Sequence, residues 1–289
     1  MDTNCGYKLS SPQLNFMKFP LVKLFCLLLL IISSHSNAQP LLVKQAIVYS
    51  TINIIAPEDE DNQGREGGGF RNMMDGETKL TTYSKNELSK TLIKSEFMNS
   101  SIYRDNSNNR STTIMEIMGQ KMGFYTDDQE IAKMQKMRDS MANVRKENRD
   151  YSNVEVEVSV TTETAKMNGY SCKKTFLITK RPLGRQDTAI VWYTPEIKMQ
   201  SYLAGMSGGS MGMMPGLENA IKKMDKIDGF VTSYEMKMNR GRVMKMEVTK
   251  IDIKTPVEEK EFQLPKNIDI KPISEMRNLF GGMMRGNSQ

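Results

Sequence analysis

The amino-acid sequence predicts a mainly β protein of the α+β class, with an antiparallel sheet and one long amphipathic helix. Three observations lead to this prediction. Valine alternates with other residues from Val154 to Val160, the dipeptide Asn168-Gly169 is typical of a two-residue β-hairpin turn, and apolar residues recur every three or four positions from about 127 to 147. A period of two is typical of a half-buried strand, and the longer period is typical of a helix.

The N-terminal segment has the pattern of a cleavable signal peptide. Lys18 and Lys23 precede an apolar run from Leu24 to Ile32, and small residues follow up to Ala38. A membrane-spanning helix needs roughly 20 apolar residues, which this run does not supply. We therefore predict a 1–38 segment that is removed (signal core 17–38) and an exported protein, in the periplasm or outside the cell, that starts at 39.

Removal of this segment excludes several classes of function. It takes away three lysines and Asp2, so the formal net charge falls by two, from +6 to +4. It also removes the only histidine, His35, and leaves Cys172 as the only cysteine. Catalytic triads and zinc sites that need histidine are then excluded. The small net charge, with no basic stretch, argues against a nucleic-acid partner. We predict no catalysis and no cofactor.

One domain is predicted from 39 to 270. Its expected strands are rich in β-branched and apolar residues and lie at 43–55, near 78–83, 91–98 and 111–118, at 154–160 and at 187–194. The one long helix starts behind Thr126 and Gln129, which are interpreted as a capping box. Its apolar stripe consists of Ile131, Met134, Met137 or Arg138, Met141 and Val144.

Two segments have the composition of loops inserted into this domain. Residues 57–77 are acidic and then Gly-rich, and residues 205–214 are rich in Gly, Met and Ser. Pro215 opens a short helix predicted at about 215–225. Residues 271–289 are predicted to form a flexible C-terminal tail.

The Asn168-Gly169 turn fixes the register of the first hairpin, because a type I′ turn needs left-handed conformations at both of its residues. Counting back from the turn pairs apolar residues with one another and opposite charges with one another. The predicted pairs are Met167 with Tyr170, Ala165 with Cys172, Glu163 with Lys174 and Val160 with Leu177.

A second hairpin is predicted around the three-residue loop Asn239-Arg240-Gly241, with Gly241 in the left-handed position. A two-residue loop would set Met236 against Lys245, whereas the longer loop keeps the methionines on one face. The predicted pairs are Met236 with Met244, Tyr234 with Met246 and Glu235 with Lys245.

Methionine is unusually abundant, since 23 of the 25 methionines remain after Met1 and Met17 are removed. Three interpretations stay open. The methionines fill an irregular core, they line a deformable apolar cavity, or they bind Cu(I) through thioethers. The candidate copper ligands are Met211, Met213 and Met214. Cys172 is interpreted as a small buried hydrophobe rather than a reactive thiol.

Four short motifs stand out: G-x-x-C-K-K at 169–174, W-Y-T at 192–194, Pro-Gly at 215–216 and F-Q-L-P at 262–265. Together they resemble a family of uncharacterised exported bacterial proteins with a domain of unknown function, related to the GLPGLI family. Met214 departs from that family's leucine. Such families resemble the periplasmic lipoprotein carriers of the LolA/LppX type. The resemblance implies an antiparallel half-barrel, closed by the two predicted helices over an apolar cavity.

The function predicted from these observations is an exported binding protein that holds an apolar ligand, such as a lipid, an acyl chain or a lipoprotein anchor. The residues expected to line its cavity are Met134, Met141, Trp192, Met236, Met244 and Met246. The alternative is a non-catalytic structural or interaction protein of the cell envelope, with a fully packed core. Contact with a membrane is expected to be peripheral at most, and no oligomeric state is predicted.

Overall fold

The computed structural model describes residues 39–56, 76–96, 99–117, 119–145, 155–180, 186–199, 224, 226–238 and 241–275. The chain divides into two compact units, Met1–Gln39 and Pro40–Gln289, and the structure described below belongs to the second. The signal segment, nearly all of the 57–77 insertion, the 205–214 insertion and the short helix except Met224 lie outside the described residues.

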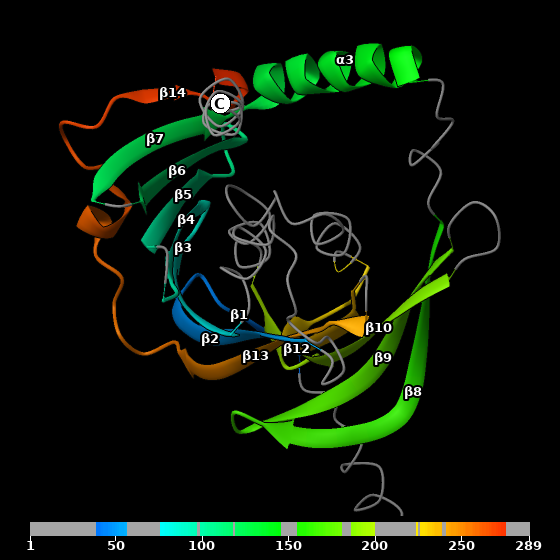
Figure 1. Ribbon diagram of the computed structural model, residues 1–289. Helices are drawn as coiled ribbons and strands as arrows, with labels where there is room; N and C mark the ends of the chain where they lie inside the picture. Colours follow the sequence, from blue (N-terminus) through cyan, green and yellow to red (C-terminus); the bar gives the residue numbers. More distant parts are fainter. Residues whose placement is uncertain are drawn as a thin grey trace, which may run out of the picture. The chain divides into compact units, whose positions relative to one another are not determined.

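A twelve-stranded sheet dominates the described part of the chain (Figure 1). Its strand order is β14-β7-β6-β5-β4-β3-β2-β13-β12-β10-β9-β8, and every neighbouring pair is antiparallel except β14 and β7. The strands are β2 Gln45–Ile55, β3 Gly76–Lys85, β4 Leu88–Lys94, β5 Asn99–Asp105, β6 Arg110–Ile117, β7 Gln120–Thr126, β8 Glu155–Met167, β9 Tyr170–Lys180, β10 Gln186–Thr194, β12 Phe230–Lys237, β13 Val243–Asp252 and β14 Ile270–Pro272. Separately, β1 (Leu41–Leu42) pairs in parallel with β11 (Ile197–Lys198).

The sheet is large, curved and open, which confirms the predicted mainly β fold class. The 3-10 helix η5, Glu259–Phe262, contacts one face of the sheet and so identifies it. Lys90 on β4 contacts Glu261 at 2.9 Å, and Lys85 on β3 contacts Glu259 at 2.6 Å. Figure 1 shows this C-terminal segment on the outer side of the curve. The face that carries Lys85 and Lys90 is therefore convex, and the alternate residues of each strand face the concave side.

The main hydrophobic core lies on the concave face. Strand alternation places there the buried residues Val48, Ile52, Ile54, Leu80, Ile93, Ile102, Leu177, Val191, Tyr234, Met244 and Met246. A smaller cluster contains Met115 and Phe124, against which Met122 and Ile273 pack. The concave face is thus apolar along much of the sheet.

The first hairpin has the predicted turn, with Asn168 at φ 53° and Gly169 at φ 85°. Ala165 pairs with Cys172 as predicted, but Val160 pairs with Thr175 rather than Leu177, so that part of the register is wrong. The cause is a bulge between Val160 and Thr164.

Local hydrogen bonds stabilise this bulge. The Thr161 hydroxyl donates to the Lys174 carbonyl at 3.0 Å and accepts from the Glu163 amide at 3.2 Å. The Glu163 carboxylate still reaches Lys174 at 3.0 Å. A side-chain bond of this kind competes with the strand ladder, and counting from the turn does not reveal it.

The second hairpin is confirmed throughout. Met236 pairs with Met244, Tyr234 with Met246 and Glu235 with Lys245, and Gly241 has φ 75°. The three-residue loop therefore gives the correct register.

The predicted long helix is α3, Asp128–Arg145. Its N-cap lies one residue later than predicted. The Asp127 carboxylate, not the Thr126 hydroxyl, accepts a hydrogen bond from the backbone amide of Glu130 at 2.9 Å. Asp127 and Glu130 then have the spacing of a capping box. Along the described part of the helix, Ile131 is 44 % exposed and Met137 is 38 % exposed, so this side of the apolar stripe faces solvent.

The chain remains in regular structure beyond residue 270, where the domain was expected to end. Strand β14 pairs in parallel with β7, with Ile270 opposite Gly123. The Ser274 amide then donates to Glu130 at 3.3 Å. Glu130 is 1 % exposed and also contacts Lys133 at 2.6 Å. This buried carboxylate joins the first turn of α3 to the C-terminal segment.

Candidate functional site

The concave face has an apolar zone at β12, β13 and β2. Met244 and Met246 on β13 are 1 % and 2 % exposed. Tyr234 on β12, the strand between β13 and β10, is 2 % exposed. The Tyr234 hydroxyl donates to the Met236 sulfur at 3.1 Å, and burial raises the pKa of Tyr234 well above its usual range. The register therefore brings three of the predicted site residues, Met236, Met244 and Met246, onto one face.

Of the other predicted site residues, Met134 and Trp192 lie outside this zone. Met134 is half-buried on α3, and the side chain of Met141 lies outside the described residues. Trp192 belongs to the opposite face, since its neighbour Val191 pairs with Tyr234 on the concave face. There the Lys174 ammonium lies 5.9 Å from the centre of the Trp192 ring. The candidate copper ligands Met211, Met213 and Met214 also lie outside the described residues.

A second, hydroxyl-lined zone follows on β3 to β7. One lateral row of this face consists of Ser84, Ser89, Arg104, Ser111 and Thr126, each opposite the next across neighbouring strands. Ser89 is 1 % exposed and Ser111 is 4 % exposed. Among the residues that the structure describes, their hydroxyl oxygens have no hydrogen-bond partner, and neither does that of Ser100 farther along the same face. Buried hydroxyls without partners are uncommon in proteins, and each one needs an explanation.

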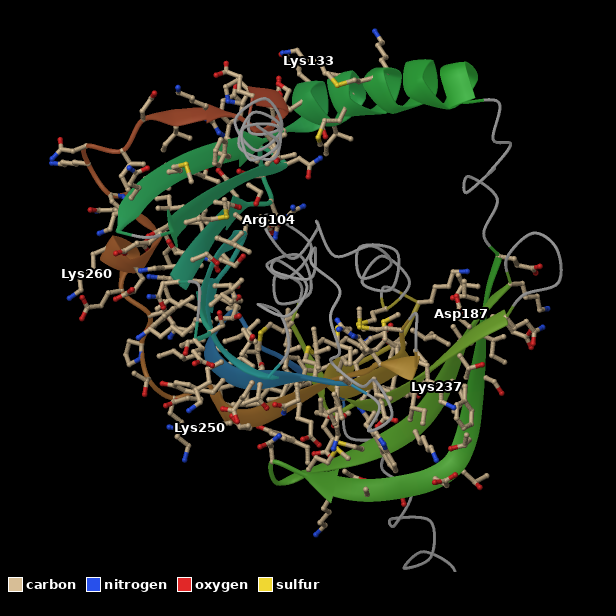
Figure 2. The ribbon with its side chains drawn as sticks, viewed as in Figure 1. Arg104, Lys133, Asp187, Lys237, Lys250 and Lys260 are labelled. Atoms are coloured by element: carbon tan, nitrogen blue, oxygen red, sulfur yellow. The ribbon has the colours of Figure 1, made fainter. Side chains whose placement is uncertain are left out.

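Arg104 is the cation in the middle of this row (Figure 2). Its Nε donates to the Asn106 side-chain oxygen at 2.7 Å, and its Nη2 donates to the Asn109 side-chain oxygen at 3.0 Å. Figure 2 shows Arg104 on the inner side of the curve, whereas Lys250 and Lys260 point outward. The two amides hold the guanidinium in place and leave Nη1 for another acceptor.

The electrostatics of Arg104 suit an anion. Within the described part of the chain, the guanidinium forms no ion pair with a carboxylate. Burial lowers the pKa of Arg104, and the nearby Asp128 opposes that change. Asp128 itself accepts a hydrogen bond from the Asn109 side-chain amide. An arginine stays protonated under such conditions, so Arg104 places a positive charge beside two hydroxyls that lack partners.

Sequence reasoning missed this second zone. Strand β5, which carries Arg104, was not among the expected strands, because Asn99–Asp105 has only one aliphatic residue. The available signal was the alternation of hydroxyl residues, at Ser89 and Thr91 on β4 and at Ser111 and Thr113 on β6. Strand alternation places such residues on one face.

A groove of about 220 Å³ lies elsewhere, where the chain after η5 meets the ends of β4 to β7. Its lining includes Leu92, Ser101, Ile114, Pro265 and Ile268. Ligand pockets commonly measure roughly 300–1,000 Å³, so this groove is too small to enclose a lipid.

Cys172 is fully buried, as interpreted from its strand position. The Thr232 hydroxyl contacts its sulfur at 3.5 Å, and burial raises the pKa of the thiol. In the part of the chain that the structure describes, no helix has the length and apolar character needed to cross a membrane.

Comparison with known proteins places the chain in a family. The model of DUF4412, a domain of unknown function, matches residues 69–268. The chain belongs to the DUF4412 family. This match confirms the predicted membership of a family defined by a domain of unknown function. No curated protein matches the sequence.

Among solved structures, this DUF4412 protein is similar to a domain from Vibrio parahaemolyticus, provisionally assigned as an outer membrane lipoprotein-sorting protein domain. The two share 7 % sequence identity, and the likeness covers 81 % of this chain and 95 % of that one, with a TM-score of 0.20. A likeness with so low a score carries no argument about function.

Proposed function

We propose that this DUF4412 protein is an exported, non-catalytic binding protein that holds an amphiphilic lipid on the concave face of its sheet. The observation that carries the proposal is the division of this face into an apolar zone and a hydroxyl-lined zone with one arginine. A lipid has the same two parts. The signal-peptide pattern up to Ala38 supports export, and the loss of His35 with that segment supports a function without catalysis.

The two zones are connected by apolar side chains. From Arg104, the concave face continues through Ile102, Ile93 and Leu80, which are 1 %, 3 % and 3 % exposed. It then reaches Ile52 on β2, which pairs directly with Met246 on β13. A lipid whose head group lies at Arg104 therefore has a continuous apolar path for its tail, and burial of a tail along such a path is favourable.

The methionines suit the far end of this path. An unbranched thioether adapts its shape to different neighbours, so Met236, Met244 and Met246 would accommodate tails of different length or saturation. The proposal therefore includes a cavity lined by these three methionines, which holds the tail.

A second candidate, a structural or interaction protein of the cell envelope, is favoured by the burial of the methionines. Met244 and Met246 are nearly inaccessible and belong to the packed core. In this reading the concave face is filled by the protein's own side chains and has no ligand. The two candidates differ in whether the purified protein carries or takes up a lipid.

Native mass spectrometry of the protein recovered from its own cell envelope under mild conditions separates them. The binding proposal predicts a reproducible additional mass that extracts into organic solvent and that added fatty acid or phospholipid restores. A mass equal to that of the protein alone, with no uptake of added lipid, would overturn it and leave the structural candidate.

A further inference from the structure

We propose that Arg104, Ser89 and Ser111 bind the oxyanion head group of the lipid, a carboxylate or a phosphate, so that the protein selects anionic amphiphiles over neutral ones. This inference rests on the proposed function and adds the chemical class of the ligand.

The register places the three side chains together. Ser89 on β4 and Ser111 on β6 each pair directly with Arg104 on β5. In a sheet, the Cβ atoms of residues paired in this way are about 4.5–5.5 Å apart. Two hydroxyls therefore flank the root of the arginine on the same face, one from each neighbouring strand.

Part of the hydrogen-bonding capacity of these three side chains is unused. The hydroxyls of Ser89 and Ser111 are buried and have no partner among the described residues, although burying a hydroxyl without a partner costs free energy. The bonds of Arg104 to Asn106 and Asn109 use its Nε and Nη2. Both hydroxyls and Nη1 are therefore available as donors to one acceptor on the concave side.

An oxyanion is the acceptor that fits these donors. Carboxylate and phosphate oxygens accept several hydrogen bonds at once, and charge-assisted bonds from arginine are stronger than neutral ones. A neutral ester would accept fewer bonds and would form no charge-assisted contact with Arg104. The adjacent residue on the concave face, Ile102, is 1 % exposed and apolar, which suits the first carbons of a tail.

Arg110 provides a matched control for Arg104. It lies one strand away, at the start of β6, and pairs with Asp105. Its guanidinium stacks on the Tyr125 ring at 4.5 Å, on the opposite face of the sheet from Ser111. Replacing it removes the same charge without touching the proposed head-group site.

The experiment is a binding titration of the exported protein with oleate, methyl oleate and inorganic phosphate, each measured by isothermal calorimetry. It compares the wild type with Arg104→Gln, Ser89→Ala/Ser111→Ala and Arg110→Gln, after circular dichroism has shown that each variant is folded. Arg104→Lys is included because it keeps the charge and is the variant most certain to fold.

We expect the wild type to bind oleate at least about tenfold more tightly than methyl oleate, since hydrogen bonds to a charged group change affinity by that order. Arg104→Gln and the double serine variant should abolish this preference while methyl oleate binding is unchanged. Arg104→Lys should retain part of the preference, and Arg110→Gln all of it.

Three results would overturn the inference in distinguishable ways. Equal affinity of the wild type for oleate and methyl oleate, or an unchanged preference in Arg104→Gln, leaves a lipid-binding protein without this head-group site. Binding of inorganic phosphate as tightly as oleate identifies a free anion as the ligand and removes the role of the tail. Binding of none of the three ligands overturns the proposed function as well.

Discussion

Arg104 on β5 lies directly opposite Ser111 on β6, and the hydroxyl of Ser111 is buried without a hydrogen-bond partner in the part of the chain that the structure describes. A positive charge and an unused donor are thus held side by side on the concave face of the sheet. The bulk of that face is apolar.

If Met244 lines a lipid cavity as proposed, Met244→Ala in the lipid-free protein should lower the free energy of unfolding by much less than the roughly 2–5 kcal/mol measured for large-to-small changes in packed cores. Met244 is 1 % exposed within the main core, so the full loss of roughly 2–5 kcal/mol is the result that the structural candidate requires. Met137→Ala on the exposed side of α3 is the control, with an expected change within about 0.5 kcal/mol. Chemical denaturation of the two variants measures both values. A small effect for Met244→Ala would mean that this side chain faces a void in solution.

Glu130→Gln should destabilise the protein at neutral pH by about 1–2 kcal/mol, through the loss of charge-assisted hydrogen bonds. Hydrogen bonds from Lys133 and Ser274 lower the pKa of Glu130 below its usual value in the folded protein. The stabilisation is therefore present above the unfolded-state pKa of about 4.3 and is lost as the pH falls through the folded-state pKa.

The measurement for Glu130 is the difference in unfolding free energy between wild type and variant from pH 7 down to pH 3. The difference should shrink towards the acid end. Glu258→Gln, which removes an exposed partner of Lys260, should show little change at any pH. A difference for Glu130→Gln that is constant with pH would show that its carboxylate is not the ionised group of this contact.

Gly229→Ala should destabilise the protein more than Gly169→Ala. Gly169→Ala forces alanine into a left-handed conformation at φ 85° but meets no atom within 4 Å, so it should cost roughly 1–2 kcal/mol. A Cβ at Gly229 would lie 2.5 Å from the Thr194 carbonyl oxygen, so Gly229→Ala requires the backbone to shift and should cost more. Thermal unfolding compares them, and the reverse order would contradict the described approach of Gly229 to β10.

Cys172 should not react with thiol reagents in the folded protein. It is fully buried, and burial raises the pKa of its thiol, so little thiolate is present. Mass spectrometry after treatment with iodoacetamide should find the cysteine unmodified under native conditions and modified in denaturant. Rapid modification of the native protein would show that β9 opens or that the thiol is reactive.

The sequence alone predicted the elements whose geometry is decided locally. The register around Gly241 was correct because only the three-residue loop keeps Met236, Met244 and Met246 on one face. The turn at Asn168-Gly169 was correct because its two residues tolerate left-handed conformations. The helix at Asp128–Arg145 followed from its period, which depends on no distant contact.

What the sequence did not predict depends on contacts between distant residues or on a competing local bond. The bulge before Thr164 arises because the Thr161 hydroxyl bonds to Lys174 across the hairpin. The N-cap of α3 is Asp127 and not Thr126. Both residue types are able to cap a helix, and in the structure the Asp127 carboxylate accepts the hydrogen bond from the Glu130 amide.

The hydroxyl zone was not predictable for a related reason. It forms only when three separate strands place Ser89, Arg104 and Ser111 in one row. No single segment of the sequence shows this row, since the strand with Arg104 is rich in polar residues and lacks a clear apolar alternation.

The most direct test of the central claim is photo-crosslinking of the protein with a fatty acid that carries a diazirine near the end of its tail, followed by peptide mapping. The account predicts labelled peptides from β2, β12 and β13 on the concave face, including the one that contains Met244, and loss of the label when excess oleate competes. Labelling confined to the groove at Leu92, Ile114 and Pro265, or labelling that oleate does not compete away, would contradict it.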